Sequence, residues 1–160
     1  MGLGFLLSDR GKGMTFKSID PKNGNLIKKY DEYSLDQVED RLQRAGECFR
    51  AWQEVSFVER VQILEELSRA LLDRKEEFAS LITQEMGKPI LQSIGEVEKC
   101  SVLCAYYSST AEKFLAPEVV STRARKSYIT HQPLGVVLGI MPWNFPFWQV
   151  FRFAIPALVS

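Results

Sequence analysis

A short segment near the end of the chain has the residue types of a fixed hydrogen-bond donor. Asn144 stands between Trp143 and Phe145, and Pro142 and Pro146 bracket these three residues. The prolines restrict the backbone on both sides, so the segment can hold a neutral side-chain amide in a fixed position. Such an amide can stabilise an oxyanion that develops during a reaction. A turn asparagine between two packing aromatics explains the same residues equally well, and on the residues alone both interpretations stay open.

The elements around this segment are those of an open α/β sheet. Residues 134–140 form a continuous apolar run, which predicts a strand buried on both faces. From Pro146 a helix is expected, with one apolar side formed by Trp148, Phe151, Ile155 and Leu158. A strand, a loop and a helix make the first half of a βαβ unit, and in such sheets ligands bind beyond the carboxyl ends of the strands. The parallel neighbour that this strand needs does not follow before Ser160. We therefore expect a larger α/β domain that is truncated at residue 160.

The preceding residues predict a hairpin and a helical layer. Residues 15–31 contain two extended segments around an Asp-Pro-Lys-Asn-Gly turn. Capping-box patterns predict helices that begin at Ser34 and at Ser56, the second continuing to Gly87. A third helix is expected between Pro89 and Pro117. Each has one apolar stripe, which is more typical of a compact helical layer than of a coiled coil.

Composition excludes several classes of protein. The 20 basic residues balance the 20 acidic ones, so a nucleic-acid partner is not expected. No apolar run reaches the ~18–20 residues of a membrane span, and residues 1–14 lack the charge order of a secretory signal. They are expected to be a flexible leader. Cys48, Cys100 and Cys104 form no CxxC pair, which favours a reducing, cytoplasmic location. Cys100 and Cys104 are interpreted as small buried hydrophobes, and His131 has no neighbours at metal-ligand spacing, so no metal is expected.

Met141-Pro142-Trp143-Asn144-Phe145-Pro146 closely resembles the signature of the aldehyde dehydrogenase superfamily. The flanking Gln132-Pro133-Leu134-Gly135-Val136-Val137 and Ile155-Pro156-Ala157-Leu158 are similar to the family in order and spacing, and Glu85-Met86-Gly87-Lys88-Pro89 resembles a second, weaker family segment. The resemblance runs from about Ile19 to Ser160. It implies that residues 15–160 are the N-terminal part of an NAD(P)-binding domain: a hairpin, a helical layer, and the first strand and helix of a Rossmann-like parallel sheet. It also implies an oligomerisation strand near residues 125–133, and hence a homo-oligomer.

The resemblance also implies roles for single residues. In the family, the residue matching Asn144 donates its amide to the aldehyde oxygen, and the cofactor lies along the end of the strand. Ile140, Met141, Pro142, Trp143 and Asn144 are therefore expected to line a site for NAD or NADP, between which the sequence does not choose. In succinate-semialdehyde dehydrogenases the position of Arg152 holds an arginine that meets the distal carboxylate of the substrate. Gln149, which shares the face of Arg152, and Phe145 are expected to line the same substrate site. A surface arginine is the alternative reading of Arg152.

The family also needs a cysteine nucleophile and a glutamate base, which lie downstream of the segment that this chain resembles. None of the three cysteines matches the nucleophile motif, so these 160 residues are not expected to turn over substrate alone. The leading hypothesis is NAD(P)-dependent oxidation of succinate semialdehyde, a small-molecule aldehyde, to succinate by the full-length enzyme. The alternatives are an aldehyde dehydrogenase of another specificity and a non-catalytic, truncated remnant.

Overall fold

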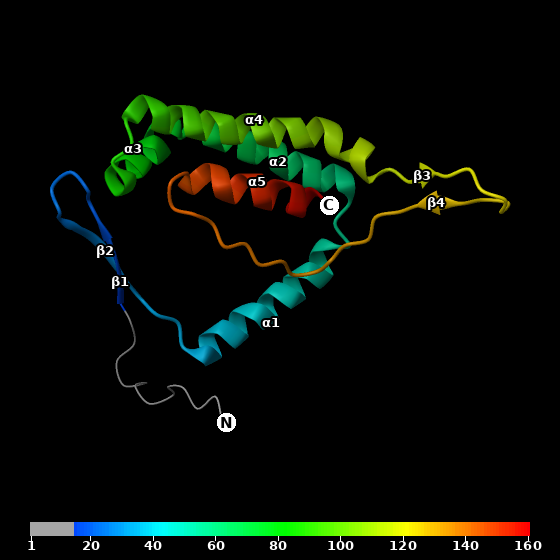
Figure 1. Cartoon of the computed structure of the whole chain (residues 1–160), viewed down its shortest axis with the longest axis horizontal. Coiled ribbons are helices and arrows are strands. Elements are labelled where there is room, and N and C mark those ends of the chain that lie inside the picture. The colour runs from blue at the N-terminus through cyan, green and yellow to red at the C-terminus, as the bar shows by residue number, and fades with distance from the viewer. Residues whose placement is uncertain (1–14) are drawn as a thin grey trace, which may run out of the picture.

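The computed structural model of the chain describes residues 15–160, so the predicted leader at residues 1–14 lies outside the described residues. Two strands come first, followed by four helices, two very short strands and a last helix (Figure 1). In chain order these elements are β1 (Thr15–Ile19), β2 (Leu26–Asp31), α1 (Leu35–Trp52), α2 (Phe57–Asp73), α3 (Lys75–Met86), α4 (Ile90–Leu115), β3 (Glu118–Val119), β4 (Tyr128–Ile129) and α5 (Pro146–Val159). The predicted α/β class with a hairpin, a helical layer and a terminal helix is confirmed.

The hairpin and the first helix begin where local side chains predict them. Strands β1 and β2 pair antiparallel, and Gly24 in their turn has a positive φ of 74°. At the start of α1, the backbone amide of Gln37 donates to Ser34 Oγ at 3.2 Å. The Ser34 amide donates in return to Gln37 Oε1 at 2.9 Å, which completes the predicted capping box.

The second predicted helix is in fact two helices. Ser56 caps α2 as expected, but α2 ends at Asp73 and α3 begins at Lys75. Arg74 leaves the helical conformation with φ −111° and ψ 20°. Its guanidinium then donates to Glu77 in the first turn of α3 and lies 4.8 Å from the centroid of the Phe78 ring. These side-chain contacts offset the loss of helical geometry, and no glycine or proline marks the break in the sequence.

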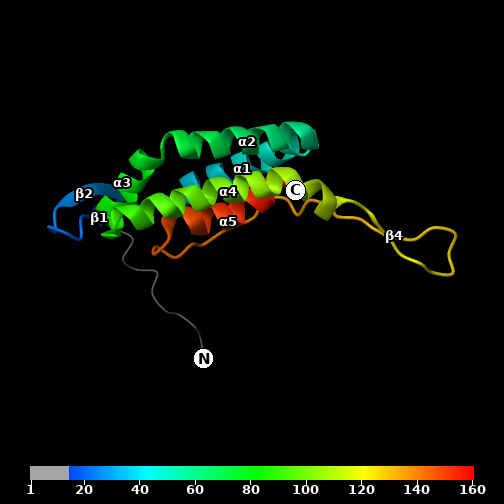
Figure 2. The same cartoon turned by 90° about the horizontal axis from the view of Figure 1, so that it is seen from above.

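Helix α4 is the longest of the described helices and packs against α2, α3 and α5, as Figures 1 and 2 show. Hydroxyl pairs at 2.8 and 3.0 Å, Ser68 with Ser101 and Thr83 with Ser93, join α4 to α2 and α3. The core around it is apolar and consists of Leu64, Leu71, Ile82, Val97, Cys100, Cys104, Ala111, Ile155 and Val159. The interpretation of Cys100 and Cys104 as small buried hydrophobes is confirmed. No helix within residues 15–160 has the length and apolar character that crossing a membrane requires.

Helix α1 forms as predicted, but its apolar stripe is largely uncovered. No residue of α1 is buried among the described residues, and Leu35 and Leu42 are 67% and 60% exposed. At its far end, Trp52 Nε1 donates to the carbonyl oxygen of Leu158 at 2.9 Å. This hydrogen bond joins the end of α1 to the end of α5.

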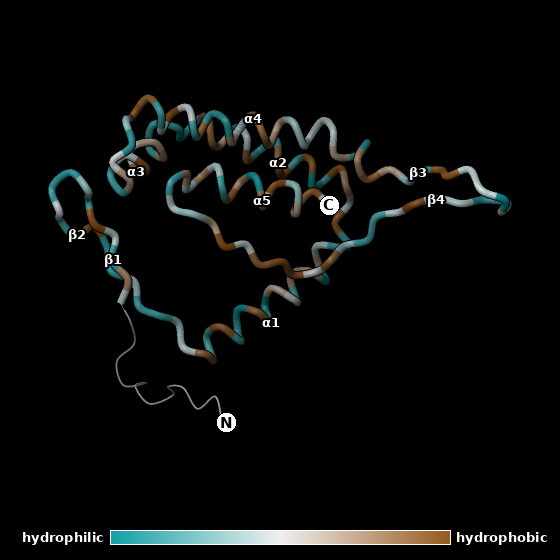
Figure 3. Tube along the Cα trace, in the orientation of Figure 1, coloured by the Kyte–Doolittle hydropathy of each residue, from teal (hydrophilic) through white to brown (hydrophobic). Residues whose placement is uncertain are grey.

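The predicted buried strand at residues 134–140 is wrong for this structure. The segment is extended but pairs with no described strand, and Leu134, Leu138 and Ile140 are 92%, 84% and 87% exposed. Figure 3 shows it as an apolar stretch leading to α5. The cause is that a parallel strand needs a neighbour for its backbone groups, and the described part of the chain offers none.

The expected extended segment at residues 127–132 contains β4, which pairs only with β3. This second hairpin projects away from the helices in both Figure 1 and Figure 2. Tyr128 and Ile129 are 54% and 51% exposed. The outer edges of the hairpin are therefore open, and an oligomerisation role for it stays a prediction.

Candidate active site

Residues 141–145, which we name the signature loop, connect the extended segment to α5. Pro146 is the first residue of α5, a position where its lack of an N–H costs nothing. Asn144 lies in the turn just before it and is exposed, and its side chain makes no hydrogen bond to any residue in the described range. Its amide is thus free to donate to a bound group, as the predicted oxyanion role requires.

Helix α5 receives its N-terminal cap from a distant residue. Phe145 at the cap position makes no side-chain cap. The amides of Phe147 and Trp148 instead donate to Glu96 Oε1 of α4, at 3.0 and 3.1 Å. Glu96 is only 5% exposed. A negative charge at a helix N-terminus is favourable, because it faces the positive end of the helix dipole.

A buried lysine completes this arrangement. Lys88 Nζ forms an ion pair with Glu96 Oε2 and lies 3.8 Å from the centroid of the Phe145 ring. Lys88 follows Gly87, whose φ of 68° ends α3 in a left-handed conformation. Two of the sequence segments that resemble the family, residues 85–89 and the signature loop, are therefore in direct contact.

Aromatic side chains hold the first turns of α5 on the helical layer. The ring centroid of Phe147 lies 5.3 Å from that of Phe78 and 6.2 Å from that of Phe151. Lys99 Nζ lies 3.9 Å from the ring centroid of Trp148. The start of α5 is thus fixed by charge, hydrogen bonds and ring packing together.

The predicted cofactor residues lie in one continuous stretch. Ile140 and Trp143 are 87% and 75% exposed, Pro142 is exposed and Met141 is half-buried. Their apolar faces fit the flat nicotinamide or ribose side of a dinucleotide, whose adenosine end would need further residues. The assignment of Ile140, Met141, Pro142, Trp143 and Asn144 to the cofactor stays a prediction.

The predicted substrate residues lie at the signature loop and on α5. Phe145 is 44% exposed, Gln149 is half-buried and Arg152 is exposed. Gln149 and Arg152 are three residues apart on α5 and therefore share a face. No carboxylate within residues 15–160 forms a salt bridge with Arg152. Its guanidinium is thus available to an anionic group, while its role and that of Gln149 stay predictions.

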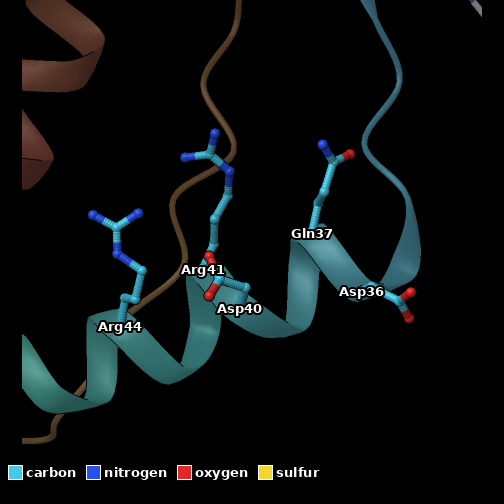
Figure 4. A pocket seen from close by; sticks show the side chains of 5 residues that line it. All are labelled: Asp36, Gln37, Asp40, Arg41 and Arg44. Carbon is cyan, nitrogen blue, oxygen red and sulfur yellow. The ribbon is translucent and has the colours of Figure 1, made fainter.

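Two hollows on the surface lie away from these residues. One, of about 320 Å³, is lined only by polar side chains of α1, namely Asp36, Gln37, Asp40, Arg41 and Arg44 (Figure 4). The other, of about 500 Å³, lies between the first hairpin and α1 and is lined by Phe16, Tyr30, Asp31, Glu32, Tyr33 and Gln37. Neither contains a predicted site residue, so the site is an open surface around the signature loop.

The two buried cysteines, Cys100 and Cys104, do not supply a nucleophile in this structure. Burial, together with the smaller effect of the nearby Glu96 carboxylate, raises the pKa of Cys100 to about 12. Burial raises the pKa of Cys104 to about 11. Both thiols are therefore protonated and inert at neutral pH, because the thiolate is the nucleophilic form. Cys48 is exposed on α1, and no group of metal-ligating side chains occurs in the part of the chain that the structure describes.

Sequence reasoning missed Lys88 and Glu96 as parts of the site. Glu96 lies 51 residues from Phe147, so no local pattern connects them. One signal was available: Glu96 stands beside Val97 on the face of α4 that carries Ser93 and Cys100 into the core. A charged residue on a buried helical face needs a partner, and that need could have indicated a polar contact.

Comparison with known proteins gives one consistent match. The family model described as the aldehyde dehydrogenase family matches residues 8–160. A probable NADP-dependent succinate-semialdehyde dehydrogenase of a Synechocystis species is 46% identical over 92% of this chain. The NAD(P)-dependent succinate semialdehyde dehydrogenase Sad of Escherichia coli is 39% identical over 89%. The chain spans only 32% and 31% of these two relatives, about a third of their length.

The solved structures agree. The succinic semialdehyde dehydrogenase of Streptococcus pyogenes, whose structure contains NADP+ as the cofactor, superposes with a TM-score of 0.86 at 28% identity. The match covers 90% of this chain and 32% of that protein. The fold of residues 15–160 therefore corresponds to about a third of that structure.

Proposed function

The chain belongs to the aldehyde dehydrogenase family, and we propose that it is the substrate-polarising part of an enzyme that oxidises succinate semialdehyde to succinate with NADP or NAD. The observation that carries this proposal is the placement of Asn144 in the loop just before α5 and of Arg152 in the middle of α5, both exposed and unpaired among the described residues. The names of the two relatives, which are succinate-semialdehyde dehydrogenases, support the substrate.

In this proposal Asn144 acts on the reacting carbonyl. A thiolate attacks the aldehyde carbon, and the carbonyl oxygen becomes an alkoxide that accepts a hydrogen bond from the Asn144 amide. A neutral donor held in place stabilises this charge without rearranging, which lowers the barrier. The thiolate comes from outside these residues, because none of the three cysteines matches the family's nucleophile motif and Cys100 and Cys104 are buried and protonated. The nicotinamide cofactor, when bound, supplies the hydride acceptor. Ile140 and Trp143 would hold its apolar side and exclude water there.

Arg152 selects the substrate. A guanidinium binds a carboxylate through two parallel hydrogen bonds, so an arginine near the reacting carbonyl favours an aldehyde with a distal carboxylate. Gln149 and Phe145 would line the space between the two ends. The alternative, an exposed surface arginine, predicts no effect of Arg152 on the choice of aldehyde.

The test is a substrate comparison with the complete protein. We expect formation of reduced cofactor with succinate semialdehyde, and a much lower kcat/KM with acetaldehyde. Arg152→Gln removes a charge-assisted contact of about 1.5–3 kcal/mol, so kcat/KM for succinate semialdehyde falls about 10- to 100-fold. Acetaldehyde, which has no carboxylate, is unaffected. Arg69→Gln, an exposed arginine on α2, is the matched control. Equal rates with both aldehydes and no effect of Arg152→Gln would indicate a different specificity.

Two further properties are part of the proposal. Copies of the protein associate through the exposed hairpin of β3 and β4, because its outer edges leave backbone groups unpaired. The three cysteines are free thiols, which fits a reducing compartment such as the cytoplasm. Light scattering of the complete protein and of its Ile129→Lys variant tests the association. A charge in that interface should break up the oligomer and so lower the molecular mass measured in solution.

A further inference from the structure

Helix α5 begins two residues after Asn144 but has no side-chain cap from its own cap residue. Pro146 carries no N–H, and the cap residue Phe145 makes no side-chain hydrogen bond. The free amides of the first turn are those of Phe147 and Trp148, and both donate to the same carboxylate oxygen of Glu96. The direction in which α5 leaves the signature loop is therefore set by a side chain of α4.

The second oxygen of Glu96 binds Lys88, and Lys88 in turn contacts the loop. Its Nζ lies 3.8 Å from the centroid of Phe145, the residue next to Asn144. Lys88 and Glu96 thus contact the residues on the C-terminal side of Asn144 without contacting Asn144 itself. Their side chains are 12% and 2% exposed, so water competes little with these contacts.

From this geometry we infer that Lys88 and Glu96 are positioning residues, which fix the direction of the Asn144 amide by holding Phe145 and the first turn of α5. The inference rests on the proposed function. An oxyanion donor is effective only in a fixed position, and a displacement of about 1 Å can reduce the rate about 100-fold. A purely stabilising role would not require charge here, because apolar pairs of similar volume often replace buried ion pairs without loss.

The double variant Lys88→Met with Glu96→Leu separates the two roles. It removes both charges together, so neither is left unpaired in the core, but α5 loses its cap. In the complete protein we expect kcat for succinate semialdehyde to fall about 10- to 100-fold, with KM for the aldehyde within about twofold. The single variant Lys88→Arg keeps the charge and the contact with an aromatic ring, so it should retain most of the kcat of the unaltered enzyme. Glu98→Gln is the control, because Glu98 forms the more exposed ion pair of the same helix with Lys75.

Amide hydrogen exchange gives a readout that does not depend on activity. In the double variant of this chain, the amide hydrogens of Phe147 and Trp148 should exchange at least about tenfold faster than in the unaltered chain. In the Glu98→Gln variant their exchange rates should be unchanged. If the complete protein oxidises no aldehyde, the proposed function fails, and exchange still decides: faster exchange supports the anchoring of the loop and unchanged exchange overturns it.

A double variant that folds and keeps the kcat of the unaltered enzyme would overturn the inference. If that variant does not fold, Glu96→Gln takes its place, because it keeps an acceptor for the two amides and removes the charge that holds Lys88. A reduced kcat at unchanged KM then supports the inference, and an unchanged kcat refutes it.

Discussion

Two lysine–glutamate pairs join neighbouring segments to α4, and they differ mainly in burial. In the first, the side chains of Lys88 and Glu96 are 12% and 2% exposed; in the second, those of Lys75 and Glu98 are 32% and 43% exposed. Replacing either lysine by methionine keeps most of the side-chain volume and removes the charge. The pair of variants Lys88→Met and Lys75→Met therefore measures what burial adds to the loss of an ion pair.

The expected effects are unequal. Lys88→Met leaves the Glu96 carboxylate buried without its counter-ion, and loss of one partner from a buried pair costs about 3–5 kcal/mol. The hydrogen bonds that Glu96 accepts from two backbone amides offset part of this penalty, so the lower end of the range applies. Lys75→Met leaves Glu98 in contact with water, where the lost attraction was already weak and screened by salt. We expect that second change to be small.

Urea unfolding of this chain, followed by circular dichroism, measures the difference. With a denaturant slope of about 1–3 kcal/mol per M, a loss of about 3 kcal/mol lowers the midpoint by about 1–3 M. Raising the salt concentration should reduce the effect of Lys75→Met further and leave that of Lys88→Met nearly unchanged. Restoring neutrality with Glu96→Leu should recover most of the stability of the Lys88→Met variant.

Equal midpoint shifts for Lys88→Met and Lys75→Met would refute this reasoning. So would a shift for Lys88→Met that decreases with salt as an exposed pair does. Either result would mean that Glu96 is in contact with water in solution, and it would also weaken the positioning role inferred for the pair.

Three other predictions follow from single sites. Asn144→Ala in the complete protein should lower kcat about 10²- to 10³-fold with any aldehyde, and steady-state rates close to the unaltered enzyme would contradict the oxyanion role. Because burial raises the pKa of Cys100 to about 12 and of Cys104 to about 11, the contribution of these two thiols to the free energy of unfolding should be constant well below pH 9. Above pH 9 it should fall by up to about 1.4 kcal/mol per pH unit for each thiol. Urea unfolding between pH 8 and 10.5 should show a flatter decline when both are alanine, and an unchanged slope would exclude the thiols as its cause. Gly87→Ala should lower the free energy of unfolding by about 1–2 kcal/mol, because φ is 68° there and Pro21 lies 3.0 Å from the added carbon. Gly46→Ala, in open space on α1, should instead stabilise the helix. Melting temperatures that shift in the same direction for both variants would contradict this.

The parts of the fold that depend on nearby residues could be predicted from the sequence. The helices that begin after Ser34 and Ser56 do so because each serine caps an amide three residues on, and the partner side chain returns the hydrogen bond. The turn of the first hairpin is equally local. These contacts need no information about the rest of the molecule, and the structure confirms them.

The parts that depend on distant residues could not. The break at Arg74 depends on a side-chain contact with Glu77 and Phe78 that leaves no mark in the apolar pattern. The strand expected at residues 134–140 needs neighbours that the pattern of its own residues cannot supply. Glu96 could be recognised as unusual on its helical face, but its partners Phe147 and Trp148 could not be identified before the packing of α5 on α4 was known.

In the proposed function, the position of Arg152 on α5 would set the length of substrate that the enzyme accepts. Arg152 lies six residues after Pro146, which is a rise of about 9 Å along the helix at 1.5 Å per residue. Long side chains on a helix lean toward its N-terminus, so we expect the arginine to reach part of this distance back toward the signature loop. A short semialdehyde of a dicarboxylic acid would then fit between the guanidinium and a carbonyl held by Asn144 better than a long one. Because this arrangement depends on where α5 begins, we expect Glu96 to influence the choice of substrate as well as the placement of Asn144. A variant that shortens the arm, Arg152→Lys, should therefore shift the preference of the complete protein toward semialdehydes with one more carbon, and an unchanged order of kcat/KM between the two lengths would show that α5 does not measure the substrate.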